Sequence, residues 1–438
     1  MTAITGAQAA TWTITAIAAG GVIGRPWRLP EAVWAVLGAA SLVALALVPW
    51  QDALGAVGRG TDVYLFLIGM MMLAELARKE GLFDWLAALA ARQAKGSAHR
   101  LFALIFGVGT MVTVFLSNDA TAVVLTPAVY ATAKAAGIEP LPYLFICAFV
   151  ANAASFVLPI SNPANLVVFG SHMPPLTSWL AQFAVPSVLS IGATYGVLRI
   201  VQRAALRQEI TKQIVVPPLS HGGRLTACGI GVGAAALLSA SALGLRLGPP
   251  TAVAGILTAA LIGCHRRSAP WQLLKNISWS VLPLVAGLFV LVEGLARTGV
   301  IQQLSQGLHA AAEHTPVAAS GIAGAMTAVA SNLMNNLPVG MIAGSAIAAA
   351  SPPPPVTAAL LIGVDLGPNL SLTGIVSDHL VAGRASARGA RHQRMAVSSY
   401  RHDSNVPCAP ASTCWASRDA LPVTGEPGAT LRVVGRGN

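Results

Sequence analysis

Long apolar runs follow one another along most of this 438-residue chain. Among them are Ala32–Val48, Val63–Ala77, Leu141–Ile160, Leu225–Leu243 and Val281–Ala296. A helix of about 20 apolar residues spans the hydrocarbon core of a bilayer. Hydrophobic residues make up 55% of the chain and charged residues only 10%, too few to cover a water-exposed surface of this size. The sequence therefore predicts an all-α polytopic membrane protein with about ten to twelve transmembrane helices.

The chain is basic, with a formal net charge of +11. Its Lys and Arg residues lie mainly in short segments between the apolar runs, which is typical of the cytoplasmic loops of membrane proteins and not of a nucleic-acid surface. The five cysteines form no CxxC pair and have no zinc-ligand spacing. We therefore expect the lipid bilayer around the chain, and no nucleic-acid partner, structural metal or cofactor.

One segment of the chain recurs 218 residues later. Leu65–Glu75 and Pro283–Glu293 share a glycine, Gly69 or Gly287, and a final glutamate, and each is followed by a basic residue and a further glycine. Internal repeats are typical of transporter folds. The repeat divides the chain into an N-terminal transport half, a cytoplasmic linker and a C-terminal transport half, which we place at 1–198, 199–224 and 225–374.

The basic residues around the repeated segment indicate its orientation in each half. In the first half Lys79, Arg92 and Lys95 follow the segment, whereas in the second half Arg266 and Arg267 precede it. Basic loops favour the cytoplasmic side of the membrane. The two halves should therefore be inverted repeats, with opposite orientations across the membrane.

Four clusters of polar and helix-breaking residues interrupt the apolar runs, two in each half. They are Leu116–Thr121, Leu158–Asn165, Ser331–Pro338 and Asp365–Gly374. Each cluster taken alone is equally typical of a turn at the membrane surface. Because unpaired backbone groups are costly in hydrocarbon, four breaks paired by a repeat favour re-entrant hairpins and broken helices around an enclosed cavity. Their free N–H and C=O groups suit a small polar or ionic substrate near the midplane.

Ionisable residues are rare within these segments. Asp119 belongs to the first cluster, and because a carboxylate facing lipid is costly, we predict that it faces the cavity and binds a proton or cation. Asp365 is its nearest functional counterpart, although the repeat places Asn336 nearer to the position of Asp119. Glu75 and Glu293 are at least as well explained by bonds to backbone groups or to a neighbouring Arg as by a functional role.

Several strings within the clusters resemble the signatures of a known family. The strings are Phe115–Pro127, Ala151–Asn165, Met334–Pro338 and Gly363–Asn369. They are similar to those of the ArsB-type arsenical pump membrane proteins, the arsenite-efflux permeases of the ion transporter superfamily. The resemblance covers about residues 30–374. The superfamily shares the clusters, whereas Ser-Asn-Pro-Ala-Asn at 161–165 and Asp-Leu-Gly-Pro-Asn at 365–369 point more narrowly to the arsenite branch.

The resemblance implies a secondary transporter of the cell inner membrane that extrudes arsenite or antimonite in exchange for protons, with optional coupling to a soluble arsenite-stimulated ATPase subunit. A neutral trihydroxide needs hydrogen-bonding groups, and Cys147 is the only cysteine in the transport core, so a three-thiolate site is not available there. The predicted substrate-binding residues are Asn118, Thr121, Ser161, Asn162, Asn165, Asn335, Asn336 and Thr373. The predicted proton-coupling residues are Asp119 and Asp365.

The sequence after Gly374 loses its apolar character. Residues 375–438 carry eight Arg, four acidic residues and no spanning run, which is typical of a disordered cytoplasmic tail. The family resemblance implies a further membrane helix here instead. Reading Asp378–Arg384 one nucleotide later permits Thr-Ile-Leu-Trp-Leu-Ala-Ala. We therefore hypothesise that a frameshift has replaced the last helix and left the second half incomplete.

Alternatives to arsenite efflux stay open. A sodium/proton antiporter or a sodium-coupled anion carrier of the same superfamily would use the same clusters to coordinate cations. An inactive frameshifted remnant would fail to accumulate in the membrane. An intramembrane enzyme is disfavoured because the sequence contains no HExxH and no GxSxG motif.

Overall fold

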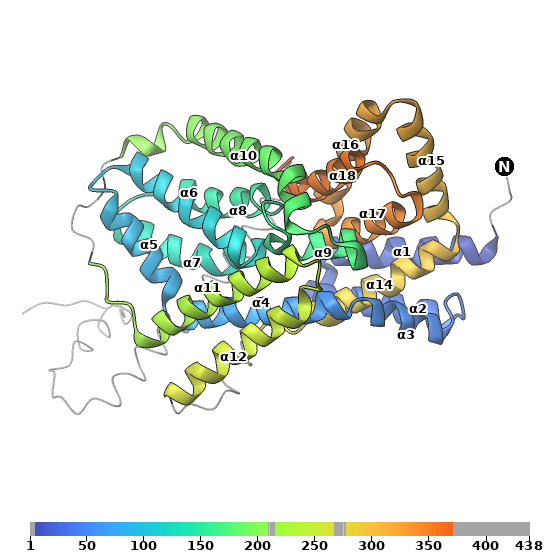
Figure 1. The fold of residues 1–438 in the computed structure, drawn as a ribbon, viewed down its shortest axis with the longest axis horizontal. Coiled ribbons are helices and arrows are strands. Elements are labelled where there is room, and N and C mark those ends of the chain that lie inside the picture. The colour runs from blue at the N-terminus through green and yellow to red at the C-terminus, as the bar shows by residue number, and fades with distance from the viewer. Residues whose placement is uncertain (1–4, 209, 211–214, 267–274, 276, 371–438) are drawn as a thin grey trace, which may run out of the picture. The chain divides into compact units, whose positions relative to one another are not determined.

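The computed structural model describes residues 5–370 except 209, 211–214, 267–274 and 276. These residues all belong to one compact unit, Met1–Gly389. The described part of the chain consists of helices and connecting turns, without a strand (Figure 1). The predicted all-α fold is thus confirmed there, while Thr373 and the tail after Gly374 lie outside the described residues.

The helices of the first half run from Gly6 to Val201. They are α1 Gly6–Gly24, η1 Pro26–Arg28, α2 Glu31–Ala44, α3 Trp50–Arg59, α4 Thr61–Lys79, α5 Leu82–Gln93, α6 Ala98–Phe115, η2 Ala120–Leu125, α7 Thr126–Ala135, α8 Leu141–Ala153, η3 Pro159–Ser161, α9 Pro163–Phe169, η4 Gly170–His172 and α10 Leu176–Val201. Side-chain caps start several of them, since Thr5 and Ser97 accept hydrogen bonds from first-turn N–H groups of α1 and α6.

The second half follows the short helix η5 (Ala205–Arg207). Its helices are α11 His221–Ala242, α12 Gly248–Arg266, α14 Val281–Arg297, α15 Val300–His314, α16 Pro316–Met334, α17 Asn336–Ala350, α18 Pro354–Leu366 and η6 Gly367–Leu370. Ser220 caps α11, and Pro316 stands in the first turn of α16, where its missing N–H has no helical partner to lose.

The helices repeat with the same offset as the sequence. Adding 218 to the bounds of α6, 98–115, gives 316–333, and α16 spans Pro316–Met334. Gly81 and Gly299, also 218 residues apart, precede α5 and α15 with φ of 72° and 86°. These values suit glycine, which lacks a Cβ. The internal repeat is therefore a repeat of structure, and its inverted orientation across the membrane stays a prediction.

Where the two halves meet, helices of one half pack against helices of the other. α4 of the first half packs along α12 of the second, and α14 of the second packs along α2 of the first (Figure 1). The repeated glycines lie at these crossings. A Cβ on Gly69 would stand 2.2 Å from the carbonyl oxygen of Thr251, and one on Gly287 would stand 2.7 Å from the carbonyl carbon of Ala35. Glycine recurs because it lets the helices of the two halves approach closely.

Within the described residues, four helices are long and apolar enough to cross a membrane by length and composition, namely α6, α10, α11 and α16. The bent pairs α3–α4 and α14–α15 raise the number to six. The sequence-based figure of about ten to twelve is larger because it comes from apolar runs and not from uninterrupted helices. α2, α8 and α17 are apolar but only 10–17 residues long, too short to cross the hydrocarbon alone.

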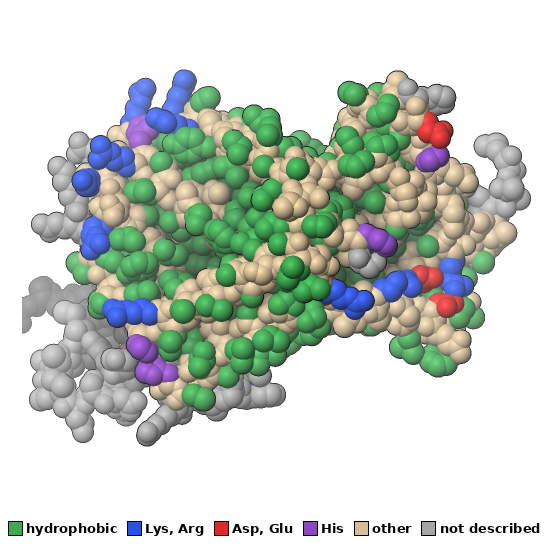
Figure 2. Space-filling model, in the orientation of Figure 1, with side chains coloured by type: hydrophobic (Ala, Val, Ile, Leu, Met, Phe, Trp, Pro, Cys, Tyr) green, Lys and Arg blue, Asp and Glu red, His purple; other side chains and the backbone are tan. Residues whose placement is uncertain are grey.

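Hydrophobic side chains cover much of the described surface (Figure 2). On α10, Val185, Val188 and Leu189 are 69%, 70% and 66% exposed, as expected for a lipid-facing helix. Figure 2 shows one group of Lys and Arg side chains at the left, where α5, α6 and the end of α10 lie, and a second group toward the right beside acidic side chains. Arg92 of α5 and Arg199 of α10 are exposed, and the exposed Arg59 and Arg297 pair with acidic residues. Charged side chains gathered apart from apolar surface are typical of a membrane protein.

Candidate functional site

All four polar clusters lie at breaks between helices. The first break separates α6 from η2, the second separates α8 from α9, the third separates α16 from α17, and the fourth ends α18. At the third break a single residue, Asn335, joins the two helices with φ of 74°. The interruptions expected from the sequence are therefore confirmed, and the roles of the individual side chains depend on their partners.

The side chains of the first break differ in accessibility: some are engaged in internal hydrogen bonds and others can be reached from outside. The hydroxyls of Thr113 and Thr121 are 2.8 Å apart, and neither residue is exposed. Both also contact the carbonyl oxygen of Gly109, at 2.9 and 3.4 Å. Asp119, by contrast, is exposed, and Asn118 is half-buried. Asp119 and Asn118 can thus meet a solute, whereas the hydroxyl of Thr121 is engaged inside the helix pair.

The second break is held by two buried polar side chains. The amide of Asn165 lies 3.0 Å from the carbonyl oxygen of Ser155 and 3.3 Å from those of Leu158 and Pro159. The hydroxyl of Ser161 donates to the carbonyl oxygen of Val114, at 3.1 Å, and so ties this loop to α6. Ser161 and Asn165, both predicted to bind substrate, satisfy backbone groups freed by the break.

The third break has a similar internal structure. The backbone N–H of Asn336 donates to Oδ1 of Asn335, at 2.7 Å, at the start of α17. The hydroxyl of Ser331 donates to the carbonyl oxygen of Val364 at 2.5 Å, and it lies 3.3 Å from Oδ1 of Asn336. Asn335 is exposed and Asn336 is buried. Of the two predicted ligands here, Asn335 is the one a solute can reach.

The second and fourth breaks meet across the two halves. Nδ2 of Asn162 donates to Oδ1 of Asp365, at 2.8 Å, and both residues are buried. Oδ1 of Asn162 accepts from the backbone N–H of Ala164, so the same side chain caps α9. The cap fixes which amide atom faces Asp365. Asn162 thereby joins the start of a first-half helix to the end of a second-half helix.

A second bridge runs beside the first. Nδ2 of Asn152 donates to Oδ1 of Asn369, at 2.9 Å, and Nδ2 of Asn369 donates to the carbonyl oxygen of Phe149, at 3.1 Å. Neither asparagine is among the predicted site residues. Their signal in the sequence is their place, since each lies where an apolar helix breaks off, but only the fold shows that the two breaks face one another.

Two buried oxygen atoms in this region accept no hydrogen bond from any described residue within 3.5 Å. They are Oδ2 of Asp365 and Oδ1 of Asn165, and both residues are 0% exposed. An unsatisfied buried acceptor is costly, more so when it carries charge. A proton on Oδ2, or a small cation bound by oxygen atoms, would remove that cost. Asp365 is thus fully buried with one carboxylate oxygen unsatisfied, whereas the side chain of Asp119 is exposed although it lies deep among the helices.

Other ionisable residues of the repeat have structural partners. Arg78 donates to both carboxylate oxygens of Glu75, and Glu293 is paired with Arg59 and Arg297. Both repeated glutamates thus have the arginine partners that a structural role predicts. No three His, Cys, Asp or Glu side chains of the described residues come together in a way that could hold a metal ion.

The fold and these breaks agree with a match to a known family. The sequence profile of the citrate transporter family, CitMHS, matches residues 14–364. The chain belongs to this family. As a family member with apolar helices interrupted by polar breaks, it is a membrane protein and a secondary transporter.

Individual relatives add detail. The arsenical pump membrane protein of Yersinia enterocolitica is 26% identical over 325 residues, which cover 70% of this chain and 74% of that protein. An uncharacterized transporter of Mycobacterium tuberculosis is 25% identical over 387 residues, covering 83% of this chain and 87% of that one. The resemblance to arsenical pump membrane proteins is thereby confirmed.

A solved structure shares the fold. The crystal structure of the YdaH transporter of Alcanivorax borkumensis, described as having an unusual topology, matches with a TM-score of 0.51 and 16% sequence identity. The match covers 82% of this chain and 90% of that one. At this identity the likeness concerns the fold alone.

Proposed function

We propose that this transporter extrudes arsenite and antimonite across the cell inner membrane in exchange for protons. The names of relatives such as the arsenical pump membrane protein of Yersinia enterocolitica support the substrate. The chemistry of the breaks also supports it, because their exposed groups are amides and a carboxylate, as at Asn118, Asn335 and Asp119. A neutral trihydroxide both donates and accepts hydrogen bonds, and amide and carboxylate groups can bind it through hydrogen bonds without thiolates.

The observation that carries the proposal is the position of Asp365. Its carboxyl group is buried where the two halves meet, one oxygen accepts from Asn162, and the other accepts no hydrogen bond from the described residues. Buried ionisable residues in membrane proteins mark proton relays and ion pathways. A carboxyl group in this place couples protonation to the contact between the halves, because the charge on Asp365 sets the strength of its bond to Asn162.

The proposed exchange has a simple charge balance. One side of the membrane presents the solute to Asn118 and Asn335, with Thr121 and Asn336 as further ligands if the breaks open, while Asp365 holds no proton. Protonation of Asp365 from the other side weakens the charge-assisted bond to Asn162 and favours the alternative arrangement of the halves. The neutral trihydroxide carries no charge, so the proton is the only charge that crosses. Thr373 and Asp119 are proposed as a further ligand and a proton entry group.

The test is arsenite uptake into everted membrane vesicles with an acid interior. Asp365→Asn cannot take up a proton, and it should abolish uptake driven by the pH gradient while the protein still accumulates in the membrane. Asp365→Glu should retain pH-dependent uptake. The matched control is Asp52→Asn, which should behave as the wild type: Asp52 lies on α3, its side chain is 44% exposed, and it pairs with Arg297 of α14. Gradient-driven uptake by Asp365→Asn would contradict the role of Asp365.

Asp119 is tested in the same vesicles. If it passes protons toward Asp365, Asp119→Asn should flatten the pH dependence of arsenite uptake. Unaltered pH dependence would remove Asp119 from proton coupling. Coupling to a soluble arsenite-stimulated ATPase subunit is a separate proposal. It requires that the subunit bind vesicles containing this chain and that ATP raise arsenite uptake.

A second candidate function is favoured by the family match itself. The matching profile describes citrate transporters, and the oxygen atoms of Asp365 and Asn165 that lack partners would also suit a sodium ion. Under this alternative the chain carries an organic anion together with sodium. Sodium-dependent citrate uptake combined with indifference to arsenite would establish it and would overturn arsenite efflux.

A further inference from the structure

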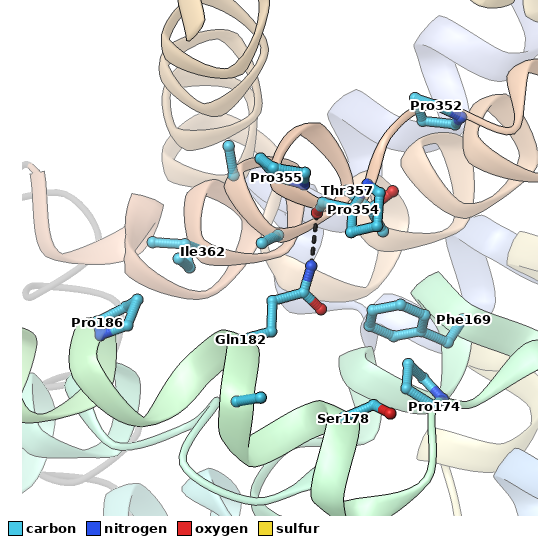
Figure 3. A pocket seen from close by; sticks show the side chains of 13 residues that line it. Phe169, Pro174, Ser178, Gln182, Pro186, Pro352, Pro354, Pro355, Thr357 and Ile362 are labelled. Carbon is cyan, nitrogen blue, oxygen red and sulfur yellow. Dashed lines mark hydrogen bonds between the residues drawn. The ribbon is translucent and has the colours of Figure 1, made fainter. Parts of the chain in front are cut away.

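An apolar cavity of about 820 Å³ lies between α10 of the first half and α18 of the second (Figure 3). Ten of the thirteen residues that line it are Phe, Pro, Ala or Ile, and none is charged. Its polar side chains are Ser178, Gln182 and Thr357. Such a lining offers nothing to hold an ion and therefore does not suit the transported solute. It suits a long apolar group with one polar end.

The cavity continues the lipid-facing surface of the protein. α10 is one of the candidate membrane spans, and next to the cavity its side chains Val185 and Leu189 are 69% and 66% exposed. Ala181 and Pro186 of the same helix line the cavity. A bilayer lipid can therefore reach the cavity by moving sideways, without crossing water.

Polarity changes along the cavity in one direction. Figure 3 shows Ser178, Pro174 and Pro352 toward one end, and Pro186 and Ile362 at the other. With a rise of about 1.5 Å per residue, Ser178 lies about 3 Å and Pro186 about 15 Å along α10 from its first residue. The polar side chains thus extend from Ser178 at one end to Gln182 and Thr357 in the middle, and the far end at Pro186 and Ile362 is apolar. The first part suits the ester groups of a lipid and the far end suits its acyl chain.

The cavity also bridges the two halves. Nε2 of Gln182 donates to the carbonyl oxygen of Pro354, at 2.5 Å, across its mouth. Beneath it, Trp179 and Phe183 of α10 pack with Leu361 of α18 in one hydrophobic cluster. An apolar chain in the cavity would extend this cluster, because it adds contacts to both helices at once.

We propose that the cavity is a phospholipid site: one acyl chain lies between α10 and α18, with its ester end beside Ser178 and Thr357. The occupant is a bilayer lipid, since the cavity opens on the lipid-facing side, its polarity matches that of a phospholipid, and no charged residue lines it. The proposal is independent of which solute the transporter carries.

The experiment uses the full chain reconstituted in phosphatidylcholine vesicles that contain a phosphatidylcholine with a photoactivatable diazirine in one acyl chain. After irradiation, mass spectrometry resolved to single residues should find the label on Thr357 and Ile362 of α18, which line the cavity, while label on the exposed face of α10 comes from bulk lipid and serves as the internal reference. Ala181 is exposed and lines the cavity, so Ala181→Trp should fill it with little cost to folding and should abolish this label. Ala184, exposed on the same helix but outside the cavity, gives the control Ala184→Trp, which should keep the label.

A second measurement covers the case in which Ala181→Trp fails to accumulate. Ser178→Phe narrows the polar end from another exposed position, and it should likewise lose the label while its neighbour Thr177→Phe keeps it. Native mass spectrometry of the purified wild type should show one retained phospholipid that is missing from the cavity-filling variants. Equal labelling of cavity and control variants, or a retained molecule that is not a phospholipid, would overturn the proposal.

Discussion

The helix α6 of the first half and its counterpart α16 in the second occupy matching places in the repeat, but they are covered to different extents. Of the apolar 18-residue stretch in each helix, 50% is buried in α6 and 17% in α16. α6 packs against α8 and the short helices η3 and η5, and its Phe106 meets Tyr195 of α10. On α16, Ile322, Met326 and Leu333 are 60–61% exposed.

The helices described after the corresponding break differ between the two halves. In the first half, α9 and α10 come after the break and help to cover it: Trp179 of α10 donates to the carbonyl oxygen of Phe156 within the break. In the second half, the counterpart of α10 at the repeat offset of 218 residues would fall at 394–419, outside the described residues. The frameshift hypothesis says that the last helix of this half, expected to pack beside the break at Asp365–Gly374, is lost.

The largest effect is expected from restoring that helix. A frame-corrected chain, expressed in an arsenite-sensitive host beside the present chain, should lower the arsenite that accumulates in the cells, because the fourth break would then be enclosed by protein. Equal accumulation with both chains would show that the second half works without the helix. If the codons for Asp378–Arg384 gave no apolar run in the shifted frame, the frameshift hypothesis would be wrong.

The next largest difference between α6 and α16 is expected in the free energy of unfolding when one side chain on each helix is truncated. Phe102 on α6 is fully buried, so Phe102→Ala should lower the free energy of unfolding by about 3–5 kcal/mol. Met326 on α16 is 61% exposed, and Met326→Ala should change it by less than about 0.5 kcal/mol. Urea unfolding in detergent, monitored by tryptophan fluorescence, measures both. A large loss for Met326→Ala would show that another surface covers α16.

The two hydrogen-bonded bridges between the halves should contribute differently to the free energy of unfolding, because one is buried and the other half-buried. Asn162→Ala removes the donor to buried Asp365 and the cap of α9, and it should cost about 3 kcal/mol in the same unfolding assay. Asn369→Ala removes the half-buried bridge to Asn152 and should cost about 1 kcal/mol. The reverse order would mean that the contact between the second and fourth breaks is held at Asn369 and not at Asp365.

The repeated glycines give a smaller and more symmetric effect. Gly69→Ala and Gly287→Ala place a methyl group against the backbone of the other half, and each should cost about 1–3 kcal/mol, with Gly69 the more sensitive since its contact is closer. Gly107 on α6 has open space around it, so Gly107→Ala should stabilise the protein by up to about 1 kcal/mol through helix propensity. Equal changes in the free energy of unfolding for all three variants would argue against close packing of α4 on α12 and of α14 on α2.

Much of the fold is determined by patterns that are local in the chain. Apolar runs predict helices, and Pro, Gly and Asn within them predict the breaks, so the positions of Asn118, Asn162, Asn335 and Asp365 at helix ends are readable from the sequence. The sequence offset of 218 residues is also the offset between corresponding helices, because similar strings form similar helices. Gly81 and Gly299, for example, both have a positive φ directly before a helix. Glu75 and Glu293 are explained by the same local logic, each with an arginine within one turn.

Tertiary structure decided which surfaces meet and which polar groups remain free. A helix that is apolar all round gives no periodic signal for its neighbour, so the sequence could not show that α4 lies on α12 or that Asn162 faces Asp365. Nor could it show that Ser161 and Asn165 are engaged with freed carbonyl groups while Asp119 stays exposed. Partners far apart in the chain become neighbours only when close packing of small residues brings the two halves together.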